Sequence, residues 1–144
     1  MPAPATPSEA IAQRLLTDTA IVALVDARVF PSKPTQDTVG DYIVYFRQGG
    51  GDAKTIAGRS GLQAHEMRVE CYAGTQAAAE AILAAVVTRL CGRRAYGTEP
   101  AVAVWRDREN GVHGCFAQGD SDELVTDAGE QVSGQTFSLW FKPQ

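Results

Sequence analysis

Hydrophobic and polar residues alternate over one stretch near the middle of the chain. From Met67 to Ala73 every second residue is apolar, and the residues between them are polar or amphipathic. A period of two is typical of a β-strand with one buried side and one side facing solvent. The pattern predicts a half-exposed strand, and we interpret the rest of the chain as material that covers it.

The period changes to that of a helix directly after this strand. Thr75 can cap a helix, and the sixteen residues that follow contain neither Gly nor Pro before Gly92. One apolar stripe, suited to pack on the strand, consists of Ala79, Ile82, Leu83, Val86, Val87 and Leu90. The opposite side carries small residues where a solvated helix usually has Lys and Glu: Ala77, Ala81, Ala84, Ala85 and Thr88. We expect another helix of this chain or a neighbouring subunit to cover that side.

The N-terminal region predicts an extended arm followed by helix. Prolines make residues 1–7 extended, and Thr6 with Glu9 forms a capping box that starts a short helix at Pro7. Thr17 or Asp18 can cap a second short helix, so either two helices or one kinked helix is compatible with the pattern. Pro31 and Pro34 then end the helical region.

Two segments flank the central strand on its N-terminal side. Residues 41–48 are rich in β-branched and aromatic residues and predict a strand. Residues 49–61 contain five glycines and are too long for a tight hairpin, so they predict a long flexible loop. Such a loop is either mobile or becomes ordered on contact with a partner.

The C-terminal third predicts further strands. In residues 93–119, Asn110 and Gly111 form a two-residue turn between strand patterns at 101–106 and 112–118, which indicates a β-hairpin. The acidic residues 119–123 indicate an exposed bend, and residues 131–142 alternate again and predict the closing strand.

Composition limits the class of protein. A chain of 144 residues with 44% hydrophobic content suits a single domain over residues 1–144. No apolar run approaches the ~20 residues needed to span a bilayer, and no signal peptide is recognisable, so we expect a soluble protein made in the cytoplasm. Three cysteines make a disulfide framework improbable. A net charge of −4 without a cluster of basic residues argues against tight binding of nucleic acid by this protein.

Residues able to perform chemistry are sparse. His65 is expected on the solvent side of its strand, and His113 with Cys115 could supply two zinc ligands but has no second pair at metal-site spacing. The acidic residues Asp120, Asp122 and Glu123 lack the spacing of a calcium loop. We therefore predict no catalytic residue, no metal and no cofactor, and a protein that is not an enzyme.

The order of several short sequence motifs along the chain is informative. The motif from Arg28 to Pro31 follows the N-terminal helices, a glycine-rich segment ends at Gly58–Gly61, and Tyr72 stands just ahead of the alanine-rich helix. This succession resembles the tail completion, or tail terminator, family of long-tailed bacteriophages and phage-like gene transfer particles. The resemblance covers nearly the whole chain, with residues 93–119 fitting it least well.

The resemblance implies an α+β fold, in which two or three helices cover one face of an antiparallel sheet of about four to five strands. It also implies a structural virion protein, assembled in the host cytoplasm, that forms a homohexameric ring on the tail tube at the head-tail junction. The ring would stop tube polymerisation and provide the surface for head-tail joining, and DNA would pass through its lumen without specific binding.

Candidate contacts follow from this interpretation. For the tube protein or a neck (head-completion) protein they are Arg47, Lys54, Thr55, Ile56 and Arg59. For subunit packing they are the small residues on the back of the alanine-rich helix. Alternative interpretations are another neck component, such as a head-completion or stopper protein, a tail tube protein, or a small enzyme or ligand-binding domain with a cleft beside Trp105 and His113.

Overall fold

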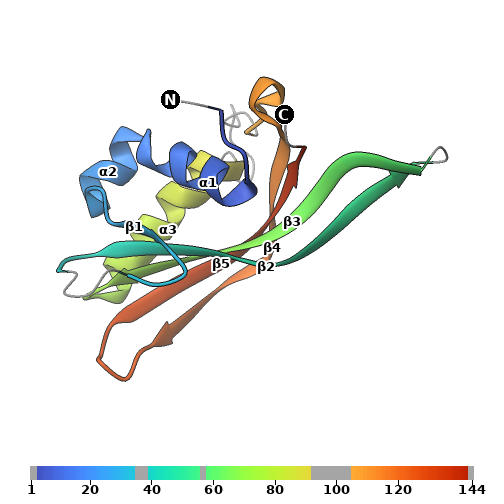
Figure 1. Ribbon diagram of the computed structural model, residues 1–144. Coiled ribbons are helices and arrows are strands. Elements are labelled where there is room, and N and C mark those ends of the chain that lie inside the picture. Colours follow the sequence, from blue (N-terminus) through green and yellow to red (C-terminus); the bar gives the residue numbers. More distant parts are fainter. Residues whose placement is uncertain (1–2, 35–38, 56–57, 92–104, 143–144) are drawn as a thin grey trace, which may run out of the picture.

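A five-stranded sheet carries three α-helices on one face (Figure 1). The computed structural model describes residues 3–34, 39–55, 58–91 and 105–142. The strand order is β1-β2-β3-β5-β4. The elements, in chain order, are α1 (Pro7–Leu16), α2 (Thr19–Val25), β1 (Val29–Pro31), β2 (Tyr42–Thr55), β3 (Gly58–Ala73), α3 (Gln76–Cys91), the 3₁₀ turn η1 (Arg108–Asn110), β4 (Val112–Val125) and β5 (Gln131–Phe141).

The fold is α+β, which confirms the expected class. The neighbouring pairs β2–β3, β3–β5 and β5–β4 are antiparallel. In contrast, β1 pairs with β2 in parallel, with Val29 opposite Ile43. The sheet is therefore mixed: it is antiparallel, as expected, over β2, β3, β5 and β4, and parallel at the β1 edge.

The predicted pair of strand and helix forms the centre of the molecule. Met67, Val69 and Cys71 of β3 are fully buried beneath the helices, and Ala79, Ile82, Leu83, Val86 and Leu90 of α3 are buried above the sheet. Thr75 caps α3 by accepting a hydrogen bond from the backbone N–H of Ala78. Gly92, the expected C-cap, lies outside the described residues.

His65 is buried, with 4% of its surface exposed, so its predicted place on the solvent side is wrong. It lies two residues before Met67 on β3 and therefore shares the helix-covered face, as the period of two requires.

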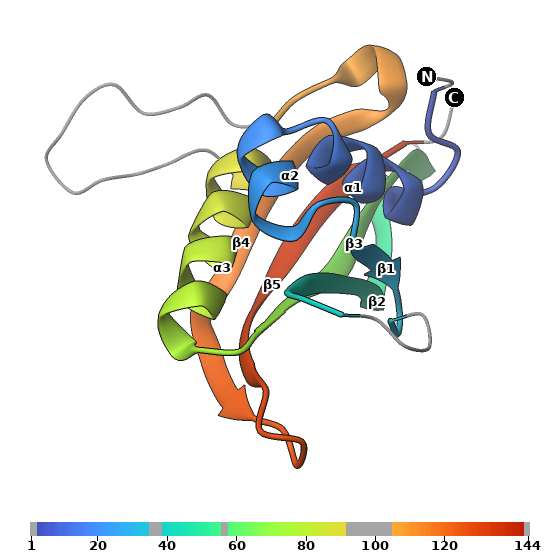
Figure 2. The same ribbon diagram turned by 90° about the vertical axis from the view of Figure 1, so that its left-hand side faces the viewer.

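The N-terminal helices begin where their caps predict. Thr6 accepts a hydrogen bond from the Glu9 N–H, and Asp18 accepts one from the Ala20 N–H, so two separate helices form. Figure 2 shows α1 and α2 beside α3 on the same face of the sheet. Within the described part, residues 3–6 precede the first helix without regular structure.

The prediction of a long flexible loop over residues 49–61 is wrong for the residues described there, 49–55 and 58–61, which lie in strands. β2 runs to Thr55 and β3 begins at Gly58, so that the two strands form one long hairpin. Pairing continues to Lys54↔Arg59 and Thr55↔Gly58, with register shifts between Arg47 and Gly49 and between Asp52 and Lys54. Glycine lowers strand propensity but does not prevent ladder hydrogen bonds, and the shifts absorb the irregular residues.

The predicted hairpin in residues 93–119 is only partly correct. Residues 101–104 of its first arm lie outside the described residues, and Asp107 makes a single isolated bridge to Val112. The turn contains η1, and Gly111 ends it with a positive φ of 89°. The second arm is much longer than expected, because β4 continues through the acidic residues to Val125, with a register shift between Gln118 and Asp122 in place of a bend.

Candidate functional site

The β2–β3 hairpin extends beyond the rest of the sheet (Figure 1). Pairing of β5 with β3 ends at Phe141↔Gln63, and Gln63 pairs with Asp52 of β2. Past Leu62, in the part of the chain that the structure describes, β2 and β3 pair only with each other. We call residues 53–55 and 58–61 the arm. A two-stranded ribbon without a third strand is marginally stable in water, so the arm is suited to gain support from a partner.

The predicted partner-contact residues gather on and near this arm. Lys54 and Arg59 occupy directly paired positions, and Thr55 pairs with Gly58. Arg47 lies nearer the body of β2, where its side chain is exposed and donates a hydrogen bond from Nε to the Gly49 carbonyl oxygen at 3.2 Å. Ile56 lies outside the described residues. Like charges at directly paired positions are unfavourable in an isolated ribbon, so carboxylates from a partner would stabilise the arm.

The predicted packing surface on the back of α3 is largely open in the single chain. Ala77, Ala81 and Ala84 are exposed, whereas Ala85 and Thr88 are half-buried. Ala85 packs against the hydrophobic core, and Thr88 donates its hydroxyl hydrogen to the Ala84 carbonyl oxygen at 2.9 Å. The helices α1 and α2 contact α3 but leave the three exposed alanines uncovered, so a neighbouring subunit remains the predicted cover.

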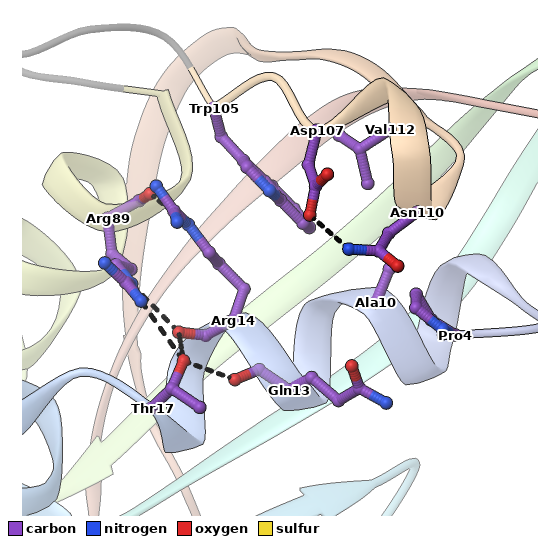
Figure 3. A pocket seen from close by; sticks show the side chains of 10 residues that line it. All are labelled: Pro4, Ala10, Gln13, Arg14, Thr17, Arg89, Trp105, Asp107, Asn110 and Val112. Carbon is purple, nitrogen blue, oxygen red and sulfur yellow. Dashed lines mark hydrogen bonds between the residues drawn. The ribbon is translucent and has the colours of Figure 1, made fainter. Parts of the chain in front are cut away.

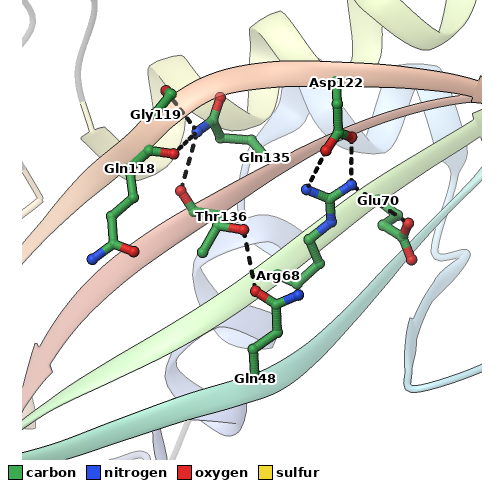
Figure 4. Close-up of polar contacts among 8 residues, drawn as sticks. All are labelled: Gln48, Arg68, Glu70, Gln118, Gly119, Asp122, Gln135 and Thr136. Atoms are coloured by element: carbon green, nitrogen blue, oxygen red, sulfur yellow. Dashed lines mark hydrogen bonds and ion pairs between the residues drawn. The ribbon is translucent and has the colours of Figure 1, made fainter.

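The sheet face opposite the helices carries a polar cluster that the sequence analysis did not predict (Figure 4). The guanidinium of Arg68 donates two hydrogen bonds to Asp122, at 2.5 and 3.1 Å, and lies 3.7 Å from a carboxylate oxygen of Glu70. The hydrogen bonds to Asp122 are the main reason that the pKa of Arg68 is raised. The alternation of β3 predicts that Arg68 and Glu70 share a face, but only the register of β4 brings Asp122 beside them.

Gln135 closes the irregular part of β4 from the other face. Its buried amide donates hydrogen bonds from Nε2 to the carbonyl oxygens of Gln118 at 2.8 Å and Gly119 at 3.2 Å (Figure 4). Gly119 has a positive φ of 65°, which glycine adopts without strain. Gln135 thus satisfies two carbonyl groups at the register shift in β4.

A pocket of about 390 Å³ lies between α1, the end of α3 and the η1 turn (Figure 3). Arg14 and Arg89 make reciprocal contacts across it: Arg14 Nε donates to the Arg89 carbonyl oxygen at 3.2 Å, and Arg89 Nε donates to the Arg14 carbonyl oxygen at 3.0 Å. Arg89 also bonds the Thr17 hydroxyl at 3.1 Å and lies 3.8 Å from Asp18. Each arginine therefore satisfies a carbonyl group in the last turn of the other's helix.

Trp105 and Asp107 form the opposite wall of this pocket. The Arg14 guanidinium carbon lies 5.4 Å from the centroid of the Trp105 ring, a cation–π contact, and Asn110 donates to Asp107 at 2.7 Å. The cleft suggested beside Trp105 thus exists, but His113 is not among its lining residues. Sequence reasoning missed the arginines because their partners lie 75 residues apart in the chain.

The described residues also bear on metal binding, disulfide formation and membrane insertion. Within them, no three His, Cys, Asp or Glu side chains gather as metal ligands. Cys71, Cys91 and Cys115 are free thiols. In the same residues, no helix is both long and apolar enough to cross a membrane.

Comparison with solved structures identifies the class of fold. A chain in "Virion of native gene transfer agent (GTA) particle" matches with a TM-score of 0.67 and 19% sequence identity, over 91% of this chain and 90% of that one. The fold is therefore one found in a virion particle. No curated protein matches the chain significantly.

Comparison with protein families identifies the chain more closely. It belongs to the family "Tail completion protein gp17", which matches residues 9–113 of the 144. The expected resemblance is confirmed. The protein is a structural component of a bacteriophage-type tail, located in the virion.

Proposed function

We propose that this protein forms a homohexameric ring on the end of the tail tube, stops tube polymerisation and provides the surface for head-tail joining. The observation that carries the proposal is the arm, a two-stranded ribbon that pairs with no third strand of the described residues and that pairs Lys54 with Arg59. A ribbon of this kind is stabilised by docking on an acidic surface of a partner. The tube protein and a neck protein are the partners proposed here.

The mechanism is geometric and requires no reaction. A subunit that contacts the last tube ring through one surface, and lacks that surface on its other side, allows no further ring to add. Ring closure places different surfaces of neighbouring copies against each other, and the exposed alanines of α3 are the candidate contact. DNA passes through the lumen without specific binding, consistent with a net charge of −4.

The arm can be removed without cutting the sheet. Because Asp52 pairs with Gln63, residues 53–62 can be replaced by Asn-Gly, which forms a two-residue hairpin turn at that point. All pairing between β3 and β5 is retained. We expect this variant to fold with unchanged thermal stability, but particles that carry it should have tails of irregular length or heads without tails in negative-stain images. Normal infectious particles would overturn the proposal.

The charges on the arm provide a finer test. Exchange of Lys54 and Arg59 for glutamate, together or singly, should give the same defect as removal of the arm, because the proposed partner surface is acidic. Exchange of both for glutamine should give a weaker defect. Exposed Lys33, which lies outside β2 and β3, serves as the control position for the same charge reversal.

Each of three alternative functions predicts a different experimental outcome. A tail tube protein should polymerise when purified, whereas a terminator should stop at a ring, and measurement of mass with and without the tube protein distinguishes them. A stopper or other head-completion protein should bind filled heads in the absence of tails. A small enzyme or ligand-binding domain that uses His113 should lose its activity in His113→Ala, whereas a structural protein should keep its assembly activity.

A further inference from the structure

The pocket between α1 and α3 holds a guanidinium whose hydrogen-bonding capacity is only partly used. Arg14 donates from Nε to the Arg89 carbonyl oxygen, and its guanidinium carbon lies over the Trp105 ring, 5.4 Å from the centroid. Its terminal Nη1 and Nη2 groups have no hydrogen-bond acceptor among the described residues, although the side chain is half-buried. Guanidinium groups present parallel N–H donors that match the two oxygens of a carboxylate.

The charges around Arg14 also favour an anion. Burial and the neighbouring Arg89 lower the pKa of Arg14, and the opposing effects of Asp18 and Asp107 are smaller. Both carboxylates already have partners, since Asp18 accepts from the Ala20 N–H and lies near Arg89, and Asp107 accepts from Asn110. The two carboxylates are thus engaged with other groups, and a bound anion would pair directly with the Arg14 guanidinium.

We propose that this pocket binds a carboxylate group of a partner protein, with Arg14 as the principal ligand and Trp105 as the wall against which the ligand packs. The source is either an Asp or Glu side chain or a chain end, which have the same chemistry. The volume of about 390 Å³ exceeds the needs of the carboxylate alone and leaves room for the carbon chain that carries it. This inference concerns a site separate from the arm and from the back of α3, and it does not depend on ring formation.

The test uses the fluorescence of Trp105. The chain contains two tryptophans, Trp105 and Trp140, so Trp140→Phe leaves the pocket tryptophan as the only one. This variant is titrated with N-acetylglutamate N-methylamide as the side-chain probe, with N-acetylalanine as the chain-end probe, and with inorganic phosphate, at constant ionic strength set by sodium chloride. We expect saturable fluorescence changes with at least one carboxylate probe. The probe that binds more tightly shows whether the ligand is a side-chain carboxylate or a chain end.

Variants separate binding at Arg14 from general attraction to a cation. Arg14→Lys keeps the positive charge but loses the paired N–H donors of the guanidinium. It should weaken binding of the tighter-binding carboxylate probe by tenfold or more, equivalent to about 1.4 kcal/mol or more. Arg14→Gln should abolish saturation. Arg28→Gln, which changes an arginine that bonds the Asp41 carbonyl oxygen elsewhere, should leave binding unchanged.

Three results would overturn the proposal. The first is no saturable change with either carboxylate probe, and the second is phosphate binding more tightly than both. The third is an equal affinity for the carboxylate probe in the Trp140→Phe protein with and without Arg14→Lys. Because Arg14→Gln removes a bond between helices, its thermal unfolding is measured first, and Arg14→Lys decides the matter if Arg14→Gln is unfolded. The arm-deleted protein should bind the probes normally, so failure of this proposal is distinguishable from failure of the proposed function.

Discussion

The guanidinium of Arg68 lies over Gly134, on the sheet face that the helices do not cover (Figure 4 shows the arginine and its carboxylate partners). β5 pairs Gly134 with Glu70 of β3 and with Asp122 of β4. A Cβ atom at position 134 would lie inside van der Waals contact with the Nη2 and Cζ atoms of Arg68. The absence of a side chain at Gly134 is therefore what allows Arg68 to reach across β5 to Asp122.

Gly134→Ala should displace Arg68 and destabilise the protein. The clash involves the guanidinium of Arg68. This side chain is only 12% exposed and makes two hydrogen bonds to Asp122, so it cannot move away without losing them. We expect a loss of about 1–3 kcal/mol in the free energy of unfolding, measured by urea denaturation.

Two further variants identify the cause. Gly74→Ala is the matched control, since no atom lies within 4 Å of a Cβ built there, and it should change stability little. In the Arg68→Ala background, Gly134→Ala should cost much less, because the clashing group is gone. Equal losses in both backgrounds would show that strand geometry, and not Arg68, explains the glycine.

Arg89→Gln should loosen the contact between α1 and α3. Arg89 bonds the Arg14 carbonyl oxygen and the Thr17 hydroxyl, and it lies near Asp18. Hydrogen bonds from a charged donor to carbonyl groups at a helix end contribute more than neutral ones, so we expect a loss of about 1–2 kcal/mol by thermal or urea unfolding. Arg106→Gln, an exposed arginine, is the control and should have a much smaller effect. A loss no larger than the control's would mean that the reciprocal contact contributes nothing.

Tyr42 should make the stability of the protein sensitive to alkaline pH. Tyr42 is 8% exposed, and its ring stacks on that of Tyr72, with centroids 4.7 Å apart. Burial and a hydrogen bond to Glu130 raise the pKa of Tyr42 to about 12. The unfolded chain releases this proton at about pH 10, so the stabilising contribution is complete below pH 10 and is lost as pH rises toward 12.

The measurement compares wild type with Tyr42→Phe. Phenylalanine retains the stacking but carries no ionisable hydroxyl, so the stability difference between the two proteins should shift in favour of the variant as pH rises from about 9 to about 11.5. Urea denaturation at each pH gives the difference. A stability difference that stays constant over this range would contradict the raised pKa.

Local patterns in the sequence predicted the elements whose signals lie within a few residues. The caps at Thr6, Asp18 and Thr75 and the alternation of β3 each depend on neighbours in the chain, and the structure contains all of them. The burial of His65 follows from the same alternation, although the sequence interpretation placed it on the other face. Periodicity was thus a better guide than the general preference of histidine for solvent.

Features that depend on pairing between distant segments could not be predicted in the same way. Glycine content predicts a loop over residues 49–61, whereas the pairing partners of residues 49–55 determine that they form a strand of the β2–β3 hairpin. The contacts of Arg14 with Arg89 and of Arg68 with Asp122 join residues 75 and 54 positions apart. Their residue types are those of ordinary surface cations, so only the fold reveals which ones meet.

Ala81→Glu should leave the subunit folded and impair its assembly. Ala81 is exposed on α3, and glutamate is a good helix former, so the unfolding free energy should change by less than about 0.5 kcal/mol. If a neighbouring copy packs on this side, a buried, unpaired carboxylate would oppose the contact strongly. The mass of the protein, alone and mixed with tube protein, should then fall from that of a ring to that of a single chain.

Ala23→Glu is the matched control, because Ala23 is also an exposed helical alanine but lies on α2, and it should assemble normally. Assembly of Ala81→Glu at the same concentration as the control would exclude the back of α3 as the subunit contact.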